Sequence, residues 1–310
     1  MRVINSKTNF DFMGRRNIAM ALSALVIIVS ISSLAIKGLN FGVDFTGGLL
    51  LELGYEQPAD LGAIRERLEE SGFEGAQAQH FGNTSDVLIR MLPRPDVETA
   101  QLGQQILTLL KAGDVAVELR RVEYVGPQVG EELTERGGTA MIFAILMIMA
   151  YIMFRFQWKF ALGSVAALVH DVVIVVGVFS LLQLPFDLSV LAAVLAVIGY
   201  SLNDTIVVFD RIRENFRLIR RGTSAAIMNT SINQMLGRTM ITSLTTLLVV
   251  MSLFFLGGEA VSGFSSALMV GIVVGTYSSI YIASTTALAL NVSPEDLLEQ
   301  KKDDEFDSEP

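Results

Sequence analysis

Long apolar stretches separated by short polar loops dominate the chain outside one polar segment. A helix needs about 20 mostly apolar residues to cross the hydrocarbon core of a bilayer. Six stretches approach or exceed this length: residues 18–36, 139–154, 160–182, 188–209, 239–256 and 263–290. The pattern predicts a polytopic α-helical membrane protein with six transmembrane helices.

The first apolar stretch has two interpretations. It follows Arg15 and Arg16, as the core of a signal peptide follows basic residues, but its 19 residues exceed the 7–15 typical of such a core. No convincing cleavage site stands after Ser32 and Ser33. We therefore interpret residues 18–36 as an uncleaved transmembrane helix.

The polar segment between the first two stretches, residues 37–135, has the pattern of a small folded domain. Strands are expected at residues 49–53, 76–81, 87–91 and 115–125. Helices are expected at residues 61–72 and 97–111, each with one apolar face and a glycine at or just after its end. The order βαββαβ is that of the split βαβ unit, and its crossovers are right-handed. The segment is thus expected to be an inserted ferredoxin-like α+β domain, with two helices on one face of a four-stranded sheet.

Charge is distributed unevenly along the chain. The 310 residues carry 23 Lys and Arg against 32 Asp and Glu, and the segment 37–135, with 8 against 17, holds the whole net charge of −9. Short segments on one side of the predicted helices are basic: four Lys or Arg in 1–17, two in 155–159, six in 211–238 and two in 291–310. The loops on the other side, 183–187 and 257–262, carry none. The positive-inside rule then predicts that both termini are cytoplasmic and that segment 37–135 lies outside.

The resulting layout has five parts: a cytoplasmic N-terminus (1–17), a first helix (18–36), the outer domain (37–135), five further helices (136–290) and a tail (291–310). Within it, the basic linker 211–238 is expected to form two cytoplasmic helices, the second capped by Thr223 and apolar on one face. Such a helix is either an interfacial linker or a docking surface for a cytoplasmic partner. The acidic cytoplasmic tail is expected to lack fixed structure.

Composition excludes several classes of protein. Hydrophobic residues make up 51% and charged residues 18%, whereas soluble domains carry roughly 25% charge. The chain has no cysteine, so it has neither disulfides nor a thiol nucleophile. Two histidines, His80 and His170, are too few for a His-rich metal site, and no cofactor or metal is expected. The negative net charge argues against nucleic-acid binding. The lack of a phosphate-binding loop argues against an ATPase, and the lack of a nucleophile elbow or another catalytic signature argues against an enzyme.

Ionisable side chains within the apolar stretches are the candidate functional residues, because a charge at the bilayer centre costs about 2.5–3.5 kcal/mol. His170 and Asp171 lie near the middle of the third stretch, where they are expected to form a structural hydrogen-bonded pair or to serve function. Asp204 lies seven residues before Arg211, about 10 Å deeper along a helix. It is interpreted as a functional, proton-carrying group, with structural hydrogen bonding as the alternative.

Polar neighbours accompany Asp204 on the fourth and fifth stretches. Ser201, Asn203 and Thr205 flank it, and Arg238 and Thr242 begin the fifth stretch. Arg238 is either an anchor at the cytoplasmic surface or the countercharge of Asp204. An aspartyl protease using Asp171 and Asp204 is disfavoured, because intramembrane acids more often serve transport. The pair Gly271 and Gly275, four residues apart, is expected to allow close helix packing.

Four motifs carry a resemblance to a known family: FGVDFTGG at 41–48, VGP at 125–127, GYSLNDTIVVFDRIREN at 199–215, and RT at 238–239. The first contains Asp44, Phe45, Thr46, Gly47 and Gly48. In these motifs the chain resembles the SecD/SecF family of bacterial protein-export membrane proteins, within the RND superfamily. The resemblance runs from the first apolar stretch to the sixth. It implies an RND half-body in the bacterial inner membrane, with the inserted domain in the periplasm.

The resemblance also implies a function and partners. It implies an auxiliary subunit of the Sec machinery that uses the proton motive force, together with SecD as obligate partner, to complete preprotein export. Further implied partners are the SecYEG channel, the SecA motor, YajC, the translocating preprotein and protons. Asp204 and Arg238 match the family's proton-relay residues, with a second acid supplied by SecD. Two alternatives stay open: half of an RND-type small-molecule or lipid exporter, and a scaffold for the channel without proton use.

Overall fold

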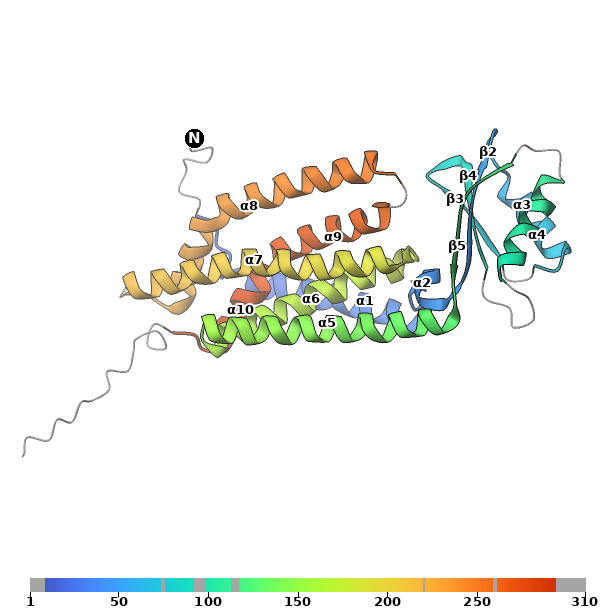
Figure 1. Ribbon diagram of the computed structural model, residues 1–310. Coiled ribbons are helices and arrows are strands. Elements are labelled where there is room, and N and C mark those ends of the chain that lie inside the picture. The colour runs from blue at the N-terminus through green and yellow to red at the C-terminus, as the bar shows by residue number, and fades with distance from the viewer. Residues whose placement is uncertain are drawn as a thin grey trace, which may run out of the picture.

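The computed structural model describes residues 9–73, 76–91, 99–112, 117–219, 221–258 and 261–293. It consists of an elongated bundle of helices with an α+β domain at one end (Figure 1). We call the end of the bundle that carries the domain the domain side and the opposite end the far side. The expectations for residues 1–8 and for the tail beyond residue 293 lie outside the described residues.

Six helical segments among the described residues are long and apolar enough to span a bilayer, which confirms the six-helix prediction. They are α1 (Arg16–Ile36), α5 (Pro127–Arg155), α6 (Trp158–Leu182), α7 (Leu188–Leu218), α8 (Ser224–Leu256) and the last segment, which begins with α9 (Ser262–Ser278). As expected, α7 continues past the apolar stretch, and Thr223 caps α8 by accepting a hydrogen bond from the Ala226 N–H.

Two of these helices are longer than expected. Helix α5 begins at Pro127, twelve residues before the apolar stretch, because the proline at the first turn suits a helix start. Helix α8 joins the expected second cytoplasmic helix and the fifth span into one helix of 33 residues. No proline interrupts this sequence. The amphipathic part and the apolar part of α8 can therefore continue as one helix without a break between them.

The sixth span is not a uniform α-helix. After α9, the π-helical turn η2 (Ser279–Ala283) leads into α10 (Ser284–Ala289). Such wide turns appear mostly as single insertions within α-helices, frequently at functional sites. Here the π turn follows immediately after Ser278, a residue of the site described below.

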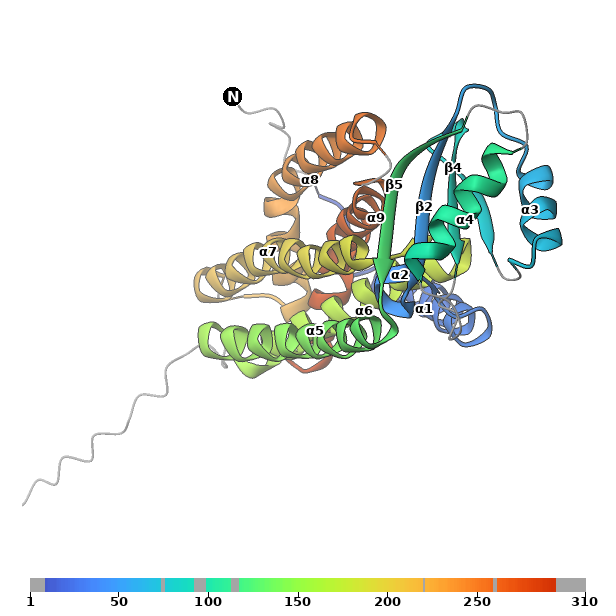
Figure 2. The same ribbon diagram turned by 45° about the vertical axis from the view of Figure 1, so that its right-hand side comes forward.

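The α+β domain has the expected ferredoxin-like topology. Its antiparallel sheet has the order β3-β4-β2-β5, formed by β2 (Gly48–Tyr55), β3 (Gln77–Phe81), β4 (Asn83–Met91) and β5 (Val117–Val125). Helices α3 (Leu61–Glu70) and α4 (Thr99–Lys111) cover one face of the sheet (Figure 2). The alternating Leu49, Leu51 and Leu53 of β2 are buried against these helices. The opposite face overlooks the bundle.

A short junction, which the sequence patterns did not predict, connects this domain to the membrane helices. It consists of β1 (Asn40–Phe41), α2 (Val43–Thr46) and β6 (Pro185–Phe186). Strands β1 and β6 pair in parallel, so that the chain just after α1 lies beside the loop before α7.

Candidate functional site

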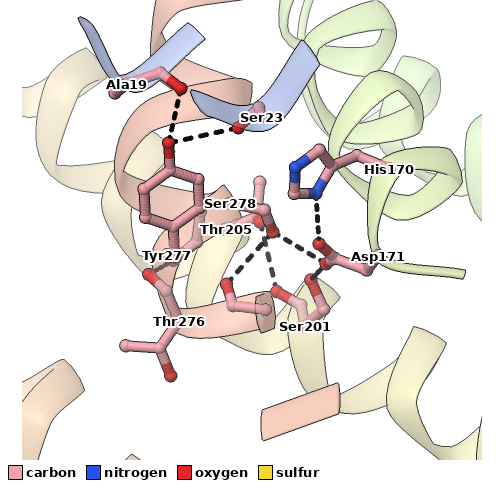
Figure 3. A network of polar contacts seen from close by, with 11 residues as sticks. Ala19, Ser23, His170, Asp171, Ser201, Thr205, Thr276, Tyr277 and Ser278 are labelled. Atoms are coloured by element: carbon pink, nitrogen blue, oxygen red, sulfur yellow. Dashed lines mark hydrogen bonds and ion pairs between the residues drawn. The ribbon is translucent and has the colours of Figure 1, made fainter. Parts of the chain in front are cut away.

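Asp171 is the centre of a buried polar network between four helices (Figure 3). Its Oδ2 accepts hydrogen bonds from Ser201 Oγ of α7 at 2.5 Å and from Ser278 Oγ of α9 at 2.7 Å. Its Oδ1 lies 2.9 Å from Nδ1 of His170, the preceding residue of α6. Asp171 is 0% exposed and His170 is 4% exposed. The expected hydrogen-bonded pair is therefore present, and two serines extend it across the bundle.

Tyr277 connects this network to the first helix. Its ring stacks on the imidazole of His170, with 6.2 Å between the ring centroids. Its hydroxyl donates to the backbone carbonyl of Ala19 at 2.7 Å and lies 3.1 Å from Ser23 Oγ, both on α1. The network thus joins α1, α6, α7 and α9 within the apolar part of the bundle.

Asp204 is the centre of a second, sparser cluster. It is 4% exposed on α7, three residues after Ser201. Its Oδ2 accepts a hydrogen bond of 3.4 Å from Ser243 Oγ of α8, and this hydroxyl lies 2.7 Å from Thr276 Oγ1 of α9. A bond of 3.4 Å is long for an O–H···O contact. The carboxyl group of Asp204 thus has much weaker hydrogen-bond support than that of Asp171.

The two clusters lie on the same pair of closely packed helices. On α9, Gly271, Gly275 and Ser278 follow one another at spacings of four and three residues and share one face. A Cβ atom added to Gly271 would lie 2.1 Å from Val197 Cγ2 of α7, and one added to Gly275 would lie 3.0 Å from Ser201 Cβ. The close packing expected of these glycines is confirmed. It brings the hydroxyl of Ser278 within reach of Asp171.

The other predicted site residues are not hydrogen-bonded to Asp171 or Asp204 among the described contacts. Among the ion pairs of the described residues, none joins Arg238 to Asp204, and the Arg238 side chain is exposed on α8. Asn203 is exposed as well. Thr205 and Thr242 donate to carbonyl oxygens of their own helices. Arg238 is thus placed on the helix that supplies Ser243, one turn and a half closer to the far side.

Of the residues in these two clusters, sequence reasoning named Ser201 only as a polar neighbour of Asp204, and it did not single out Ser278 and Tyr277. The spacing of Ser278 from Gly271 and Gly275 is the signal that places it on the packed face of its helix. Among the residues whose positions are described, no group of three or more His, Asp or Glu side chains is arranged to hold a metal ion.

The family-motif residues 44–48 form the junction between domain and bundle. Asp44 Oδ2 accepts a hydrogen bond of 3.0 Å from the Leu188 N–H, at the start of α7. Gly47 and Gly48 have φ angles of 66° and 130°, a region that favours glycine. A Cβ atom at Gly130 of α5 would lie 2.7 Å from the Phe45 carbonyl oxygen, so α5 packs directly against this turn.

Polar contacts also attach the sheet to this junction. Arg90 of β4 donates to Thr46 Oγ1 at 2.9 Å and to Asn40 Oδ1 at 3.3 Å. Burial lowers the pKa of Arg90 from its ordinary value. Beside Arg90, the open face of the sheet and the domain side of the bundle enclose a cleft of about 670 Å³, lined by Leu50, Glu52 and Asp187 among others.

Comparison with known proteins gives consistent matches. The model for the C-terminal part of the protein export membrane proteins SecD/SecF matches residues 105–293, and the SecD/SecF GG motif matches residues 32–59. Relatives named "Protein translocase subunit SecF" include one from Pseudomonas aeruginosa, 52% identical over 97% of both chains. Another, from Vibrio alginolyticus, is 50% identical over 100% of this chain and 99% of its own.

Solved structures agree. The crystal structure of SecDF from Thermus thermophilus, described as a translocon-associated membrane protein, matches 94% of this chain with a TM-score of 0.85 and 39% identity. A structure of SecDF in a super-membrane-facing form matches the same share with a TM-score of 0.70 and 38% identity. This chain spans 40% of the length of each of those chains.

The fold and the site define a class: a multi-pass membrane protein with a domain at one end and two acidic side chains buried between its helices. The family model covers more than half of the chain, and the relatives match it over nearly its whole length. The chain therefore belongs to the SecD/SecF family of protein export membrane proteins.

Proposed function

We propose that this chain is an auxiliary, non-enzymatic subunit of the Sec protein-translocation machinery, which uses the proton motive force together with SecD to complete preprotein export. The names of its relatives and the translocon association stated for SecDF support this function. The implied partners are SecD, the SecYEG channel, the SecA motor, YajC and the translocating preprotein.

The observation that carries proton use is the environment of Asp204. Its carboxyl group is buried between α7, α8 and α9, and the hydrogen bond that it accepts from Ser243 Oγ is long, at 3.4 Å. A proton crossing the membrane releases about 2.3 kcal/mol per 100 mV. We propose that Asp204 takes up and releases this proton. Arg238, which is exposed on α8, moves its long side chain toward Asp204 when the carboxylate is charged.

We also propose the orientation expected from the basic residues: a bacterial inner-membrane protein with both termini in the cytoplasm and residues 37–135 in the periplasm. The chain has no cysteine, so single cysteines report position cleanly. In sealed right-side-out vesicles, a Thr84→Cys variant, in β4, is expected to react with a membrane-impermeant maleimide. A Thr230→Cys variant, in the far-side part of α8, is expected to react only after the membrane is permeabilised. The reverse pattern would overturn the orientation.

The export role itself is tested by depletion. Because the sequence has no phosphate-binding loop, the ATP-driven motor must be another protein. Depletion is therefore expected to slow precursor processing several-fold without abolishing it, and re-expression of the chain should restore the rate. Pulse–chase labelling of an exported precursor measures this. Unchanged processing and release in depleted cells would contradict the proposal.

One observation favours the alternative of an exporter for small molecules or lipids. The cleft of about 670 Å³ between the sheet and the bundle lies in the range of small-molecule sites, about 300–1,000 Å³. A drug-efflux assay in the same depleted cells separates the two functions. Loss of efflux with normal precursor processing would favour the exporter.

A further inference from the structure

The second ring nitrogen of His170, Nε2, is a buried polar atom to which no described residue supplies a hydrogen bond. The His170 side chain is 3% exposed, and its Nδ1 is engaged by Asp171. We propose that His170 Nε2 is a second proton-binding site of the membrane helices, built by the His170–Asp171 pair and separate from Asp204.

Hydrogen-bond accounting indicates which atoms carry protons. The Oδ2 atom of Asp171 accepts from two serine hydroxyls, and its Oδ1 lies 2.9 Å from His170 Nδ1. An ionised carboxylate accepts at both oxygens and donates at neither. With Asp171 ionised, as the proposal requires, the proton of the neutral imidazole resides on Nδ1, where it is donated to Asp171. The lone pair then lies on Nε2, the ring nitrogen turned toward α1 in Figure 3.

Charge balance indicates what this lone pair does. With neutral His170, the pair carries one negative charge among apolar helices. Burial of an uncompensated charge is costly, whereas a paired and hydrogen-bonded charge is tolerated. Binding of one proton to Nε2 converts the pair into an imidazolium next to a carboxylate, with no net charge. No covalent bond other than the new N–H bond forms, and none breaks.

The surroundings contain few groups that compete for this proton. Tyr277 of α9 stacks on the imidazole, but its hydroxyl is directed to Ala19 and Ser23 of α1. Besides Tyr277, the titratable residues in the apolar parts of the elements packed against α6 are Tyr281 in η2, Tyr200 and Asp204 on α7, and Tyr151 on α5. The charged residues of α5 lie at its two ends, in 131–136 and at 155, and those of α7 beyond Asp204 lie in its far-side part, 210–217. The only charged residue of α1 is Arg16, at its first position, and α10 carries no titratable side chain.

Proton binding at His170 would act on helices that Asp204 does not reach. The His170 network includes α1 through Tyr277, whereas the Asp204 cluster includes α8 through Ser243. Both clusters use α7 and α9. A proton at either site therefore changes the charge beside the same helix pair, from opposite sides.

The small number of histidines makes the test direct. His80 and His170 are the only two in the chain, and His80 is exposed in β3. In a His80→Gln protein labelled with ¹⁵N-histidine in lipid nanodiscs, NMR observes His170 alone. We expect the Nδ1–H tautomer in the neutral state and conversion to imidazolium on acidification.

The variant that tests the pair is Asp171→Asn, and Ser164→Ala, a buried serine on the same helix, is the matched control. At one fixed pH the imidazolium fraction is expected to fall about tenfold or more in Asp171→Asn, because a carboxylate this close favours the charged form of its neighbour. It should not change in the control. An Nε2–H tautomer, or no imidazolium at any pH at which the protein stays folded, would overturn the proposal even if Asp171→Asn fails to fold.

The same spectra in an Asp204→Asn protein separate this proposal from the relay at Asp204. Persistence of the His170 titration supports a separate site, whatever happens to export. Its disappearance would mean that Asp204, and not the His170–Asp171 pair, controls the proton, and would overturn the proposal.

Discussion

Replacement of Asp204 by asparagine is expected to abolish the proton-dependent part of export while the protein stays folded. Asparagine has nearly the same shape and can still accept the hydrogen bond from Ser243, but it cannot exchange a proton. The helices around residue 204 would then keep the arrangement that they have when Asp204 is protonated and uncharged. In vesicles that contain SecD and this chain, translocation of a preprotein should no longer respond to an imposed proton gradient.

Asp210→Asn is the matched control for this variant. Asp210 lies on the same helix but is half-buried at the far side, with its Oδ1 3.3 Å from Arg155 Nη2, and its replacement should leave the gradient response intact. Arg238→Met should impair the response, whereas Arg238→Lys keeps one charge and should retain part of it. A normal gradient response in Asp204→Asn, at normal protein level, would leave Asp204 as a structural residue.

The second large effect is expected from a single added methyl group at Gly271. The Cβ atom of Gly271→Ala would lie 2.1 Å from Val197 Cγ2 and 2.7 Å from Val197 Cγ1. Val197 is fully buried, and a β-branched side chain in a helix has little freedom to rotate away. Overpacking of this kind costs about 1–3 kcal/mol. Both the thermal unfolding temperature in detergent and the export activity should fall.

Two further variants make this prediction specific. Gly199→Ala, on α7, adds the same methyl group where, among the described residues, no atom beyond its chain neighbours and the local helix backbone lies within 4 Å, and it should leave stability and export unchanged. Val197→Ala combined with Gly271→Ala removes the two clashing methyl groups and leaves only the Cβ of residue 197, at 2.9 Å, so it should recover part of the lost stability. Equal stability of Gly271→Ala and Gly199→Ala would show that the helices do not approach this closely.

The parts of the fold that were predictable are those with a local pattern. Each transmembrane helix corresponds to an apolar stretch of the sequence, so the six spans could be inferred. In the domain, strands show alternating apolar and polar residues and helices end at glycines, so the βαββαβ order could be inferred as well. The continuity of α8 could not be inferred from the sequence. One helix with an amphipathic first part and an apolar second part has the same residue pattern as two separate helices. The π turn at Ser279–Ala283 has no residue that marks it.

The candidate site was predictable only in part, for a related reason. Asp171 and Asp204 were visible as acids in apolar stretches. Their partners depend on which helices touch: Ser201 and Ser278 lie 30 and 107 positions from Asp171 along the chain. The exposed position of Arg238 likewise depends on how α8 is rotated against the bundle, which periodicity over a mostly apolar helix does not determine.

Helix α5 continues from β5 after a single residue, Gly126, and its 29 residues make a rod about 43 Å long. Very little of the rod's apolar part is buried, while its domain end packs against the turn at Phe45 and Gly47. Helix α5 is thus a rigid element that is firmly attached at its domain end to the α+β domain. A tilt of about 10° about the far-side end displaces the other end by about 7 Å over a helix of this length. Without a flexible linker to absorb the displacement, mechanical work done inside the bilayer would reach the sheet as motion.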